Sequence, residues 1–258
     1  MKKLAIALTA LAAFTAPAFA ADMAVRAPMY QPAAPVYNWT GFYIFGGAGG
    51  GLWSADSNVV TFPGGLPRTR DERLGGSGWF GTVGAGYDWQ FGSWVLGVLA
   101  DGQFGEIRGS LSDPFNFVEG REKLRDTWAA GVRLGYLVAP NVNSYVNAGY
   151  TGSEWSGTTL TSLAGGPTLA TTASFHRDGW FIGGGVENSL NFFGISAPGW
   201  FMKTEYRSAF YDRITLPETF VAGPLTASSV TFKPWVQTIS TSLVYRFNWG
   251  GPMAGSRY

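Results

Sequence analysis

The sequence has no cysteine and a single histidine, His176, among its 258 residues. The lack of cysteine excludes a disulfide framework and cysteine-based zinc or redox sites, and one histidine excludes any site that needs two. Charged residues are scarce, at 14%, against roughly 25% in ordinary soluble domains. The 18 lysines and arginines nearly balance the 17 aspartates and glutamates. The chain therefore lacks the basic excess that a sequence-independent nucleic-acid-binding protein needs.

Glycine and aromatic residues are abundant instead. The 37 glycines are roughly twice the usual share, and aromatic residues make up 16% of the chain. Disordered chains are poor in aromatic residues, so this composition argues against disorder. It is typical of β structure with much of its apolar surface in contact with another medium or partner.

The first twenty residues carry the pattern of an export signal. Lys2 and Lys3 form a positive start, residues 4–19 are uncharged, and Ala18-Phe19-Ala20 fits a cleavage site. This pattern predicts a secretory signal peptide over residues 1–20. A membrane anchor is the alternative, but the uncharged stretch is interrupted by Pro17 and is shorter than the ~20 residues that a spanning helix needs.

The rest of the chain divides into a linker, a strand-rich region and a tail. Several prolines and alanines predict an extended periplasmic linker over residues 21–38. Residues 39–247 form the predicted barrel, and residues 248–258 form a C-terminal tail. The expected strands cover residues 39–53, 78–90, 94–105, 126–138, 144–155, 178–191, 200–212 and 232–247.

The connections between the expected strands alternate in length. Three are short, at residues 91–93, 139–143 and 192–199, and four are long, at residues 54–77, 106–125, 156–177 and 213–231. Short turns at one end and long loops at the other are typical of transmembrane barrels. The chain is therefore predicted to be all-β, an eight-stranded antiparallel up-and-down transmembrane barrel with short periplasmic turns and four long extracellular loops.

Alternation within the strands indicates which face meets lipid. In residues 200–212, Trp200, Met202 and Tyr206 share one face, whereas Lys203 and Glu205 share the other. A soluble barrel would point its large apolar side chains inward and its charges to water. Here the small and polar face suits a narrow lumen, and the wide apolar face suits lipid. A soluble ligand-binding barrel remains the alternative.

Tryptophans mark the expected edges of the apolar band. Trp79 and Trp89 lie ten residues apart on one face, which at a rise of ~3.3 Å and a tilt of about 40° covers roughly 25 Å along the membrane normal. This height matches the apolar band of an outer-membrane barrel. The predicted aromatic girdle comprises Trp39, Trp79, Trp89, Trp94, Trp128, Trp180, Trp200 and Trp235, and Trp53 and Trp155 are expected at its outer edge.

The opposite face places charged side chains in the lumen. By strand parity these are Asp88, Asp101, Glu187 and Glu205, against Arg133, Lys203, Arg207 and Arg246. Four charges of each sign permit a closed ion-pair network, and buried charges are tolerated only when paired. The favoured interpretation is a structural polar core that holds the barrel rigid, and a selectivity constriction is the alternative.

Signals for catalysis are weak. Ser174 and His176 lie two residues apart, with Glu154 expected near the same end, which loosely resembles an acyl hydrolase triad. Both Ser174 and His176 fall in an expected loop. The sequence therefore predicts no catalytic residues, no cofactor and no metal site. The charged runs at residues 68–73 and 119–126 are expected to form a solvated surface.

Four segments resemble a known family. Ala21-Asp22-Met23, the proline- and alanine-rich linker, the Trp39–Tyr43 entry (Trp-Thr-Gly-Phe-Tyr) and the last strand Leu243–Phe247 (Leu-Val-Tyr-Arg-Phe) resemble the alphaproteobacterial outer-membrane β-barrel proteins, often named outer-membrane immunogenic or porin-family proteins. The resemblance implies an eight-stranded barrel in the outer membrane with its long loops outside. Such barrels commonly end on an aromatic residue of the last strand, whereas eleven residues follow Phe247 here.

These observations predict a non-enzymatic outer-membrane barrel with a structural, surface-exposed role in antigenicity and envelope integrity. A narrow, low-conductance porin for small solutes is the alternative. A soluble ligand-binding barrel and a lipid-modifying outer-membrane enzyme are less favoured. The expected partners are outer-membrane lipids, including lipopolysaccharide, and the outer-membrane insertion machinery, with no nucleic acid. The sequence does not fix the oligomeric state.

Overall fold

The computed structural model describes residues 37–192, 195–221 and 225–247. The predicted signal peptide, nearly all of the predicted linker and the tail at 248–258 lie outside these residues. The described elements are eleven β strands, and no helix among these residues is long and apolar enough to cross a membrane. The strands are β1 (Gly41–Thr61), β2 (Glu72–Phe91), β3 (Trp94–Asp113), β4 (Val118–Ala139), β5 (Val142–Trp155), β6 (Thr159–Ser162), β7 (Thr168–Thr172), β8 (Phe175–Phe192), β9 (Ile195–Tyr211), β10 (Ile214–Phe220) and β11 (Leu225–Phe247).

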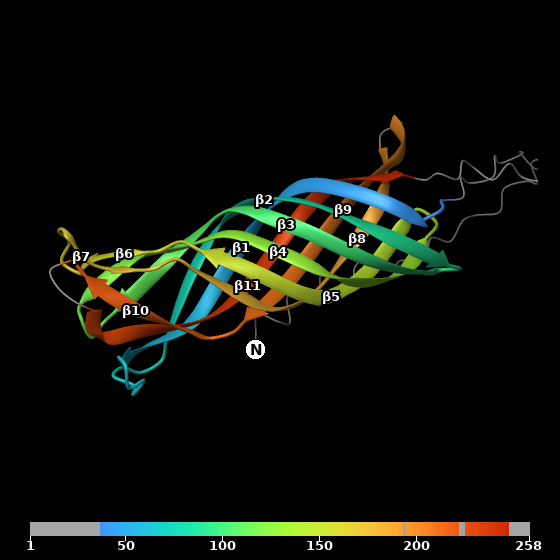
Figure 1. The fold of residues 1–258 in the computed structure, drawn as a ribbon. Helices are drawn as coiled ribbons and strands as arrows, with labels where there is room; N and C mark the ends of the chain where they lie inside the picture. Colours follow the sequence, from blue (N-terminus) through green and yellow to red (C-terminus); the bar gives the residue numbers. More distant parts are fainter. Residues whose placement is uncertain (1–36, 193–194, 222–224, 248–258) are drawn as a thin grey trace, which may run out of the picture. The chain divides into compact units, whose positions relative to one another are not determined.

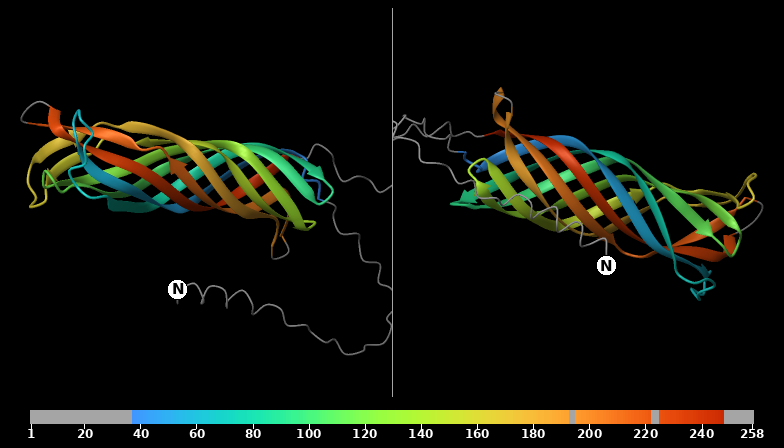
Figure 2. Two further views of the ribbon diagram at one scale, coloured as in Figure 1. Left: turned by 90° about the horizontal axis from the view of Figure 1, so that it is seen from below. Right: turned by 180° about the vertical axis from the view of Figure 1, so that it is seen from behind.

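Eight of these strands form a closed ring. Neighbours pair in the order β1-β2-β3-β4-β5-β8-β9-β11, and β11 pairs back to β1, which closes the barrel. Every pairing is antiparallel. Figures 1 and 2 show the strands inclined around the barrel axis. The predicted eight-stranded antiparallel up-and-down barrel is confirmed.

The outer connections are more ordered than the sequence suggested. Strands β1 and β11 pair without interruption from Phe42 and Phe247 to Thr61 and Ser228, well past the expected end of the first strand at residue 53. The long loops expected at 54–77, 106–125, 156–177 and 213–231 are therefore corrected: they contain the outer ends of β1–β4 and β11, and the whole of β6, β7 and β10. These added strands are short or rich in threonine, serine and glycine, so their hydrophobic alternation is weak.

The added strands close a second ring at one end of the barrel. Strand β6 pairs with the outer end of β4, β7 with β6, β10 with β7, and β11 with β10. In this ring β6, β7 and β10 take the places that β5, β8 and β9 hold in the main barrel. Figure 1 shows these three strands together at the same end. We call this part the crown: β6, β7, β10 and the outer ends of β1–β4 and β11.

Alternation along β4 illustrates how the two faces of the wall are used. Trp128, Val132 and Tyr136 point outward and are about half exposed, whereas Ala129 and Arg133 point inward and are buried. The outward face forms a band of large apolar side chains without charges. An exposed apolar band of this extent needs a non-aqueous environment, and its aromatic edges suit the two interfaces of a bilayer.

Three tryptophans lie inside the barrel, so their expected place in the girdle was wrong. Trp39, Trp53 and Trp155 are 0–1% exposed, whereas the other seven expected girdle tryptophans are 36–80% exposed. The physical reason is that large apolar residues occupy both faces of the strands concerned: on β5, which ends at Trp155, Tyr145 points inward and Tyr150 outward, and β1, which contains Trp53 and follows Trp39, is apolar on both faces. Tyr43 and Phe45 point inward while their even-numbered neighbours point outward, so parity alone did not identify the lipid face of this strand.

Glycines make room for these inward aromatic side chains. The rings of Tyr43 and Phe45 point into the lumen and lie against Gly86 and Gly84, their direct partners on the neighbouring strand β2. A Cβ atom at either glycine would collide with the facing ring. An eight-stranded barrel has an interior just wide enough for side chains to fill, and here large residues on one strand fit against glycines on the next.

Candidate functional site

The interior holds two ion-pair clusters, which together contain all eight charged residues assigned to the lumen from the sequence. Each of the eight is at most 8% exposed. The first, the turn-end cluster, comprises Asp88, Arg133, Glu187 and Arg246. The second, the mid-barrel cluster, comprises Asp101, Lys203, Glu205 and Arg207. Each cluster has two positive and two negative side chains, so each is neutral by formal charge.

In the turn-end cluster two guanidinium groups bridge two carboxylates. Arg133 Nε donates to Asp88 Oδ1 at 2.8 Å, and its Nη1 donates to Glu187 Oε2 at 3.0 Å. Arg246 Nε donates to Glu187 Oε1 at 2.8 Å, and its Nη1 lies 2.8 Å from Asp88 Oδ2. Each carboxylate therefore contacts both guanidinium groups, in a closed four-membered network taken from β2, β4, β8 and β11.

The mid-barrel cluster is built around one bidentate pair. Arg207 donates from Nη1 and Nη2 to the two carboxylate oxygens of Asp101 at 2.8 and 2.7 Å, and Nη2 also donates to Glu205 Oε1 at 2.8 Å. Lys203 Nζ lies 3.6 Å from Glu205 Oε2 and 3.3 Å from the centroid of the Phe45 ring. Glu205 also accepts a hydrogen bond from Tyr145 Oη at 2.8 Å. Planar charge-assisted pairs of this kind fix geometry strongly.

Trp39 closes the lumen beside the turn-end cluster. Its ring packs against Phe201 at 5.0 Å between centroids, and its Nε1 donates to the backbone oxygen of Pro140 at 3.2 Å. The guanidinium of Arg246 lies 4.6 Å from the centroid of the Trp39 ring. A segment expected at the membrane interface thus enters the barrel and covers the ionic network.

An aromatic plug fills the lumen at the junction with the crown. It comprises Trp53, Trp155 and Phe232, whose ring centroids lie 5.2–5.5 Å apart in edge-to-face contacts. All three are at most 1% exposed. Trp53 Nε1 donates to the backbone oxygen of Ile107 at 3.2 Å. Edge-to-face rings at this spacing pack favourably.

Some polar atoms of the lumen lack protein partners. The side-chain amides of Asn143 and Asn147, both on β5, and the hydroxyl of Ser242 on β11 are buried without a hydrogen-bond partner among the described residues. Buried polar groups are usually satisfied by ordered water when protein groups are absent. The wall beside the ionic clusters is therefore suited to a few bound water molecules.

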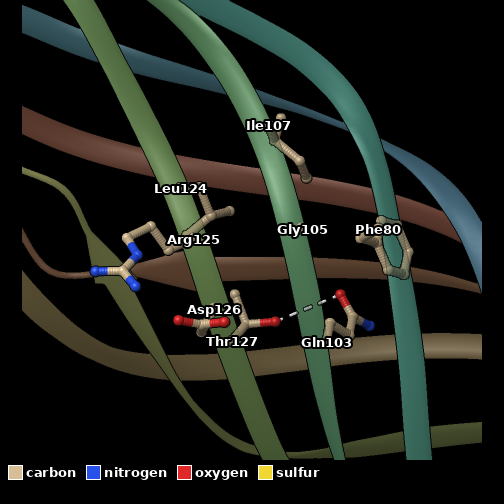
Figure 3. A pocket seen from close by; sticks show the side chains of 8 residues that line it. All are labelled: Phe80, Gln103, Gly105, Ile107, Leu124, Arg125, Asp126 and Thr127. Atoms are coloured by element: carbon tan, nitrogen blue, oxygen red, sulfur yellow. Dashed lines mark hydrogen bonds between the residues drawn. The ribbon is translucent and has the colours of Figure 1, made fainter.

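A small cavity lies between β2, β3 and β4. Figure 3 shows Ile107 and Leu124 on one side of it and Gln103 and Thr127 on the other, with Arg125 directed away. Thr127 Oγ1 donates to Gln103 Oε1 at 3.4 Å, and the cavity volume is about 10 Å³. That is room for on the order of one water molecule, so the cavity is too small for an organic ligand. It coincides with irregular pairing of β3 with β4 and of β4 with β5.

The residues considered for hydrolysis do not form a triad. His176 and Glu154 are paired across β8 and β5, and both are exposed, as is Ser174. No hydrogen bond joins Ser174 to His176 in the part of the chain that the structure describes. These three residues therefore offer no activated nucleophile.

The crown contains buried carboxyl groups that the sequence analysis did not single out. Glu122 on β4, Glu218 on β10 and Asp113 at the end of β3 are 0% exposed. They lie in segments expected to be solvated loops, and only the inward parity of their extended strands would have revealed them. The aromatic plug was missed for a related reason, because Trp53 and Trp155 were assigned to the opposite face.

Comparison with known proteins places the chain among outer-membrane proteins. Residues 6–247 match the family model described as "Outer membrane protein beta-barrel domain". The chain is also 30% identical to the 31 kDa outer-membrane immunogenic proteins of Brucella melitensis and Brucella suis. Each alignment spans 262 residues and covers 96% of this chain and 100% of the relative.

Solved structures of outer-membrane proteins are also similar. The crystal structure of the outer membrane protein OprG from Pseudomonas aeruginosa matches with a TM-score of 0.49 and 11% identity, covering 83% of this chain and 100% of that chain. Neisserial surface protein A matches with a TM-score of 0.38 and 13% identity, covering 81% of this chain and 98% of that chain.

Proposed function

Because the chain belongs to the outer membrane protein β-barrel family, we propose that it is a closed, structural barrel that exposes its crown at the cell surface. Membership of this family places the protein in the outer membrane. The observation that carries the proposal is the filled lumen. Two neutral ion-pair clusters, the aromatic plug and Trp39 lie buried in the interior at successive levels of the barrel. Such an interior gives rigidity rather than passage.

The crown gives the protein its surface role. It extends the barrel with a second ring of strands instead of mobile loops, and such a rigid surface suits recognition by antibodies. The relatives in Brucella are named as immunogenic proteins, which supports an antigenic role for this chain. We propose no enzymatic activity, since neither the lumen nor the exposed Ser174 and His176 supply an activated nucleophile.

Lipids and the insertion machinery are the proposed partners. The basic side chains of Arg73 and Arg108, which are exposed, and of Lys123, which is partly buried, lie on the outer surface of the crown, where each is paired with a carboxylate. Lipopolysaccharide carries phosphates at this level, and guanidinium groups recognise phosphates well. The last strand, β11, ends on the aromatic Phe247, which is the kind of end that the insertion machinery recognises.

A tag inserted at Gly165 tests surface exposure of the crown. This residue lies in the β6–β7 turn with a φ of 80°, and no atom lies within 4 Å of a Cβ placed there. An antibody against the tag is expected to label intact cells. The matched control is the same tag at Gly92, in the β2–β3 turn at the opposite end, where φ is 62° and space is also open; it is expected to be labelled only after the outer membrane is permeabilised. Labelling of both on intact cells, or of neither, would contradict the proposal.

A narrow pore for small solutes is the second candidate. The unpartnered amides of Asn143 and Asn147 favour it, because they would bind water beside the ionic clusters. Against it stands the aromatic plug, which would have to move before a hydrated ion could pass. The conductance measurement at the end of the Discussion decides between the two.

A further inference from the structure

A polar network locks the β3–β4 turn to two other strands of the crown. The side-chain amide of Asn116 in this turn contacts Asp113 Oδ2 at 2.6 Å, Glu218 Oε2 at 3.2 Å and Ser228 Oγ at 2.8 Å. Asp113 Oδ1 also accepts hydrogen bonds from the backbone amides of Phe115 and Asn116 at 2.8 and 3.0 Å. One cluster thus ties together the turn, β10 and β11.

The charges around Glu218 do not favour its ionised form. Among the residues that the structure describes, the charged group that faces it is Asp113, of the same sign, and its neighbours include Asn116, Ser228 and, on β7, Thr172. Arg68 of the β1–β2 loop stacks on the ring of Phe115, 4.6 Å from its centroid. Burial, followed by the hydrogen bond with Asp113 and the charge of Asp113, raises the pKa of Glu218 to about 8.

Glu122 is a second buried carboxyl group in the crown. Its Oε2 accepts a hydrogen bond from Thr158 Oγ1 at 2.7 Å, whereas its Oε1 has no partner among the described residues. Gly109 lies opposite it on β3, and its neighbours Arg121 and Lys123 point to the outer face of β4. Burial raises its pKa to about 7, although the hydroxyl of Thr158 and a backbone amide act in the opposite direction.

We propose that the crown is an acid-stabilised closure, held shut by the protonated carboxyl groups of Glu218 and Glu122 and opened by their ionisation. A protonated Glu218 can share its proton with Asp113, so the two carboxyl groups attract each other. When both are ionised they repel each other inside a dry interior. A protonated Glu122 likewise avoids the cost of a buried charge.

The direction of the pH effect follows from proton binding. In the open crown both carboxyl groups meet water and ionise at their ordinary pKa of 4.5, whereas in the closed crown they hold their protons to about pH 7 and pH 8. Between these values the closed state binds more protons than the open state, so closure weakens as pH rises. Each carboxyl group contributes about a tenfold rise in the opening constant per pH unit. Above about pH 8 both carboxyl groups are ionised in the closed crown as well, so the opening constant rises no further.

Hydrogen exchange measured by mass spectrometry tests this closure directly. The full-length folded barrel in lipid nanodiscs is compared at pH 5, 6, 7 and 8, after correction for the intrinsic pH dependence of exchange. From pH 5 to 7, the opening constants of the β10 segment and of the β6–β7 segment are expected to rise about tenfold per pH unit if opening exposes one of the two carboxyl groups to water. If opening exposes both groups, the expected rise is about a hundredfold per pH unit. Exchange in the mid-barrel part of β3 is expected to stay unchanged.

Substitutions assign the effect to the two carboxyl groups. Glu218→Gln and Glu122→Gln keep the shape and the hydrogen-bond donor of the protonated acid but cannot ionise. Each is therefore expected to reduce the rise of the opening constant by about tenfold per pH unit. Glu119→Gln is the matched control, because Glu119 is exposed on the same strand as Glu122, and it should leave the slope intact. Asp113→Asn removes the repelling charge, so opening in β10 should level off at a lower pH than in the unchanged protein.

Two results would overturn the proposal. One is a crown whose corrected opening constant does not change between pH 5 and 8. The other is a slope that persists unchanged in the Glu218→Gln, Glu122→Gln double variant. If that double variant does not fold, the decisive contrary result comes from Asp113→Asn: the opening constant in β10 would level off at the same pH as in the unchanged protein.

Discussion

Replacing Arg133 with methionine is expected to lower the free energy of unfolding by about 3–5 kcal/mol, the usual cost of removing one partner from a buried ion pair. Arg133 bridges Asp88 and Glu187, both of which are 0% exposed. Its guanidinium also lies 4.5 and 5.1 Å from the ring centroids of Tyr43 and Tyr145. Methionine fills the volume but leaves two carboxylates to one remaining guanidinium group, that of Arg246.

Urea unfolding in lipid vesicles, followed by tryptophan fluorescence, measures this loss. Arg125→Met is the matched control, since Arg125 is exposed on the same strand, and it should change the free energy of unfolding by no more than about 0.5 kcal/mol. Adding Glu187→Gln to Arg133→Met removes one unpaired charge and is expected to restore part of the stability. An Arg133→Met barrel as stable as the unchanged protein would show that the turn-end cluster does not hold the barrel together.

Replacing Val132 with arginine is expected to destabilise the barrel by about 2–4 kcal/mol, the cost of a charged side chain on the lipid face at the middle of the bilayer. Val132 is 56% exposed and lies between the outward rings of Trp128 and Tyr136 on β4. Its side chain therefore sits midway between the two aromatic edges. No acidic side chain belongs to this outward band on β4 to compensate the new charge.

The matched control places the same charge beyond the membrane. Ser110 is exposed on β3 in the crown, so Ser110→Arg is expected to change the free energy of unfolding by no more than about 0.5 kcal/mol. The same vesicle-based unfolding experiment compares the two variants. Equal effects of Val132→Arg and Ser110→Arg would contradict the assignment of the apolar band to the lipid phase.

The sequence predicted the barrel because its signal repeats in every strand. Alternation in β4 and β9 separates an apolar face from a polar one, and the even number of strands closes the ring. Parity also placed the eight charged lumen residues inside. It did not show which carboxylate meets which guanidinium. Those contacts depend on how the strands are staggered around the barrel, as in the bidentate pair of Arg207 with Asp101.

The sequence failed where both faces of a strand are alike or where alternation is weak. Trp53 belongs to the inward face of β1, which carries aromatic residues on both sides, and Trp39 lies just before this strand. The crown strands β6 and β7 have four and five residues, mostly threonine, leucine, alanine and serine. Their pairing with β4 and β10 joins segments far apart in the chain. The buried Glu122 and Glu218 could be recognised only once that pairing was known.

Conductance of the folded, full-length barrel in a planar lipid bilayer tests most directly whether the lumen is closed. On the proposed function, two neutral ion-pair clusters and the aromatic plug of Trp53, Trp155 and Phe232 block the lumen, so a protein shown to be inserted should give no discrete current steps. Reproducible steps whose size changes in Arg133→Met or Lys203→Met would contradict a closed lumen and identify the protein as a charge-lined pore.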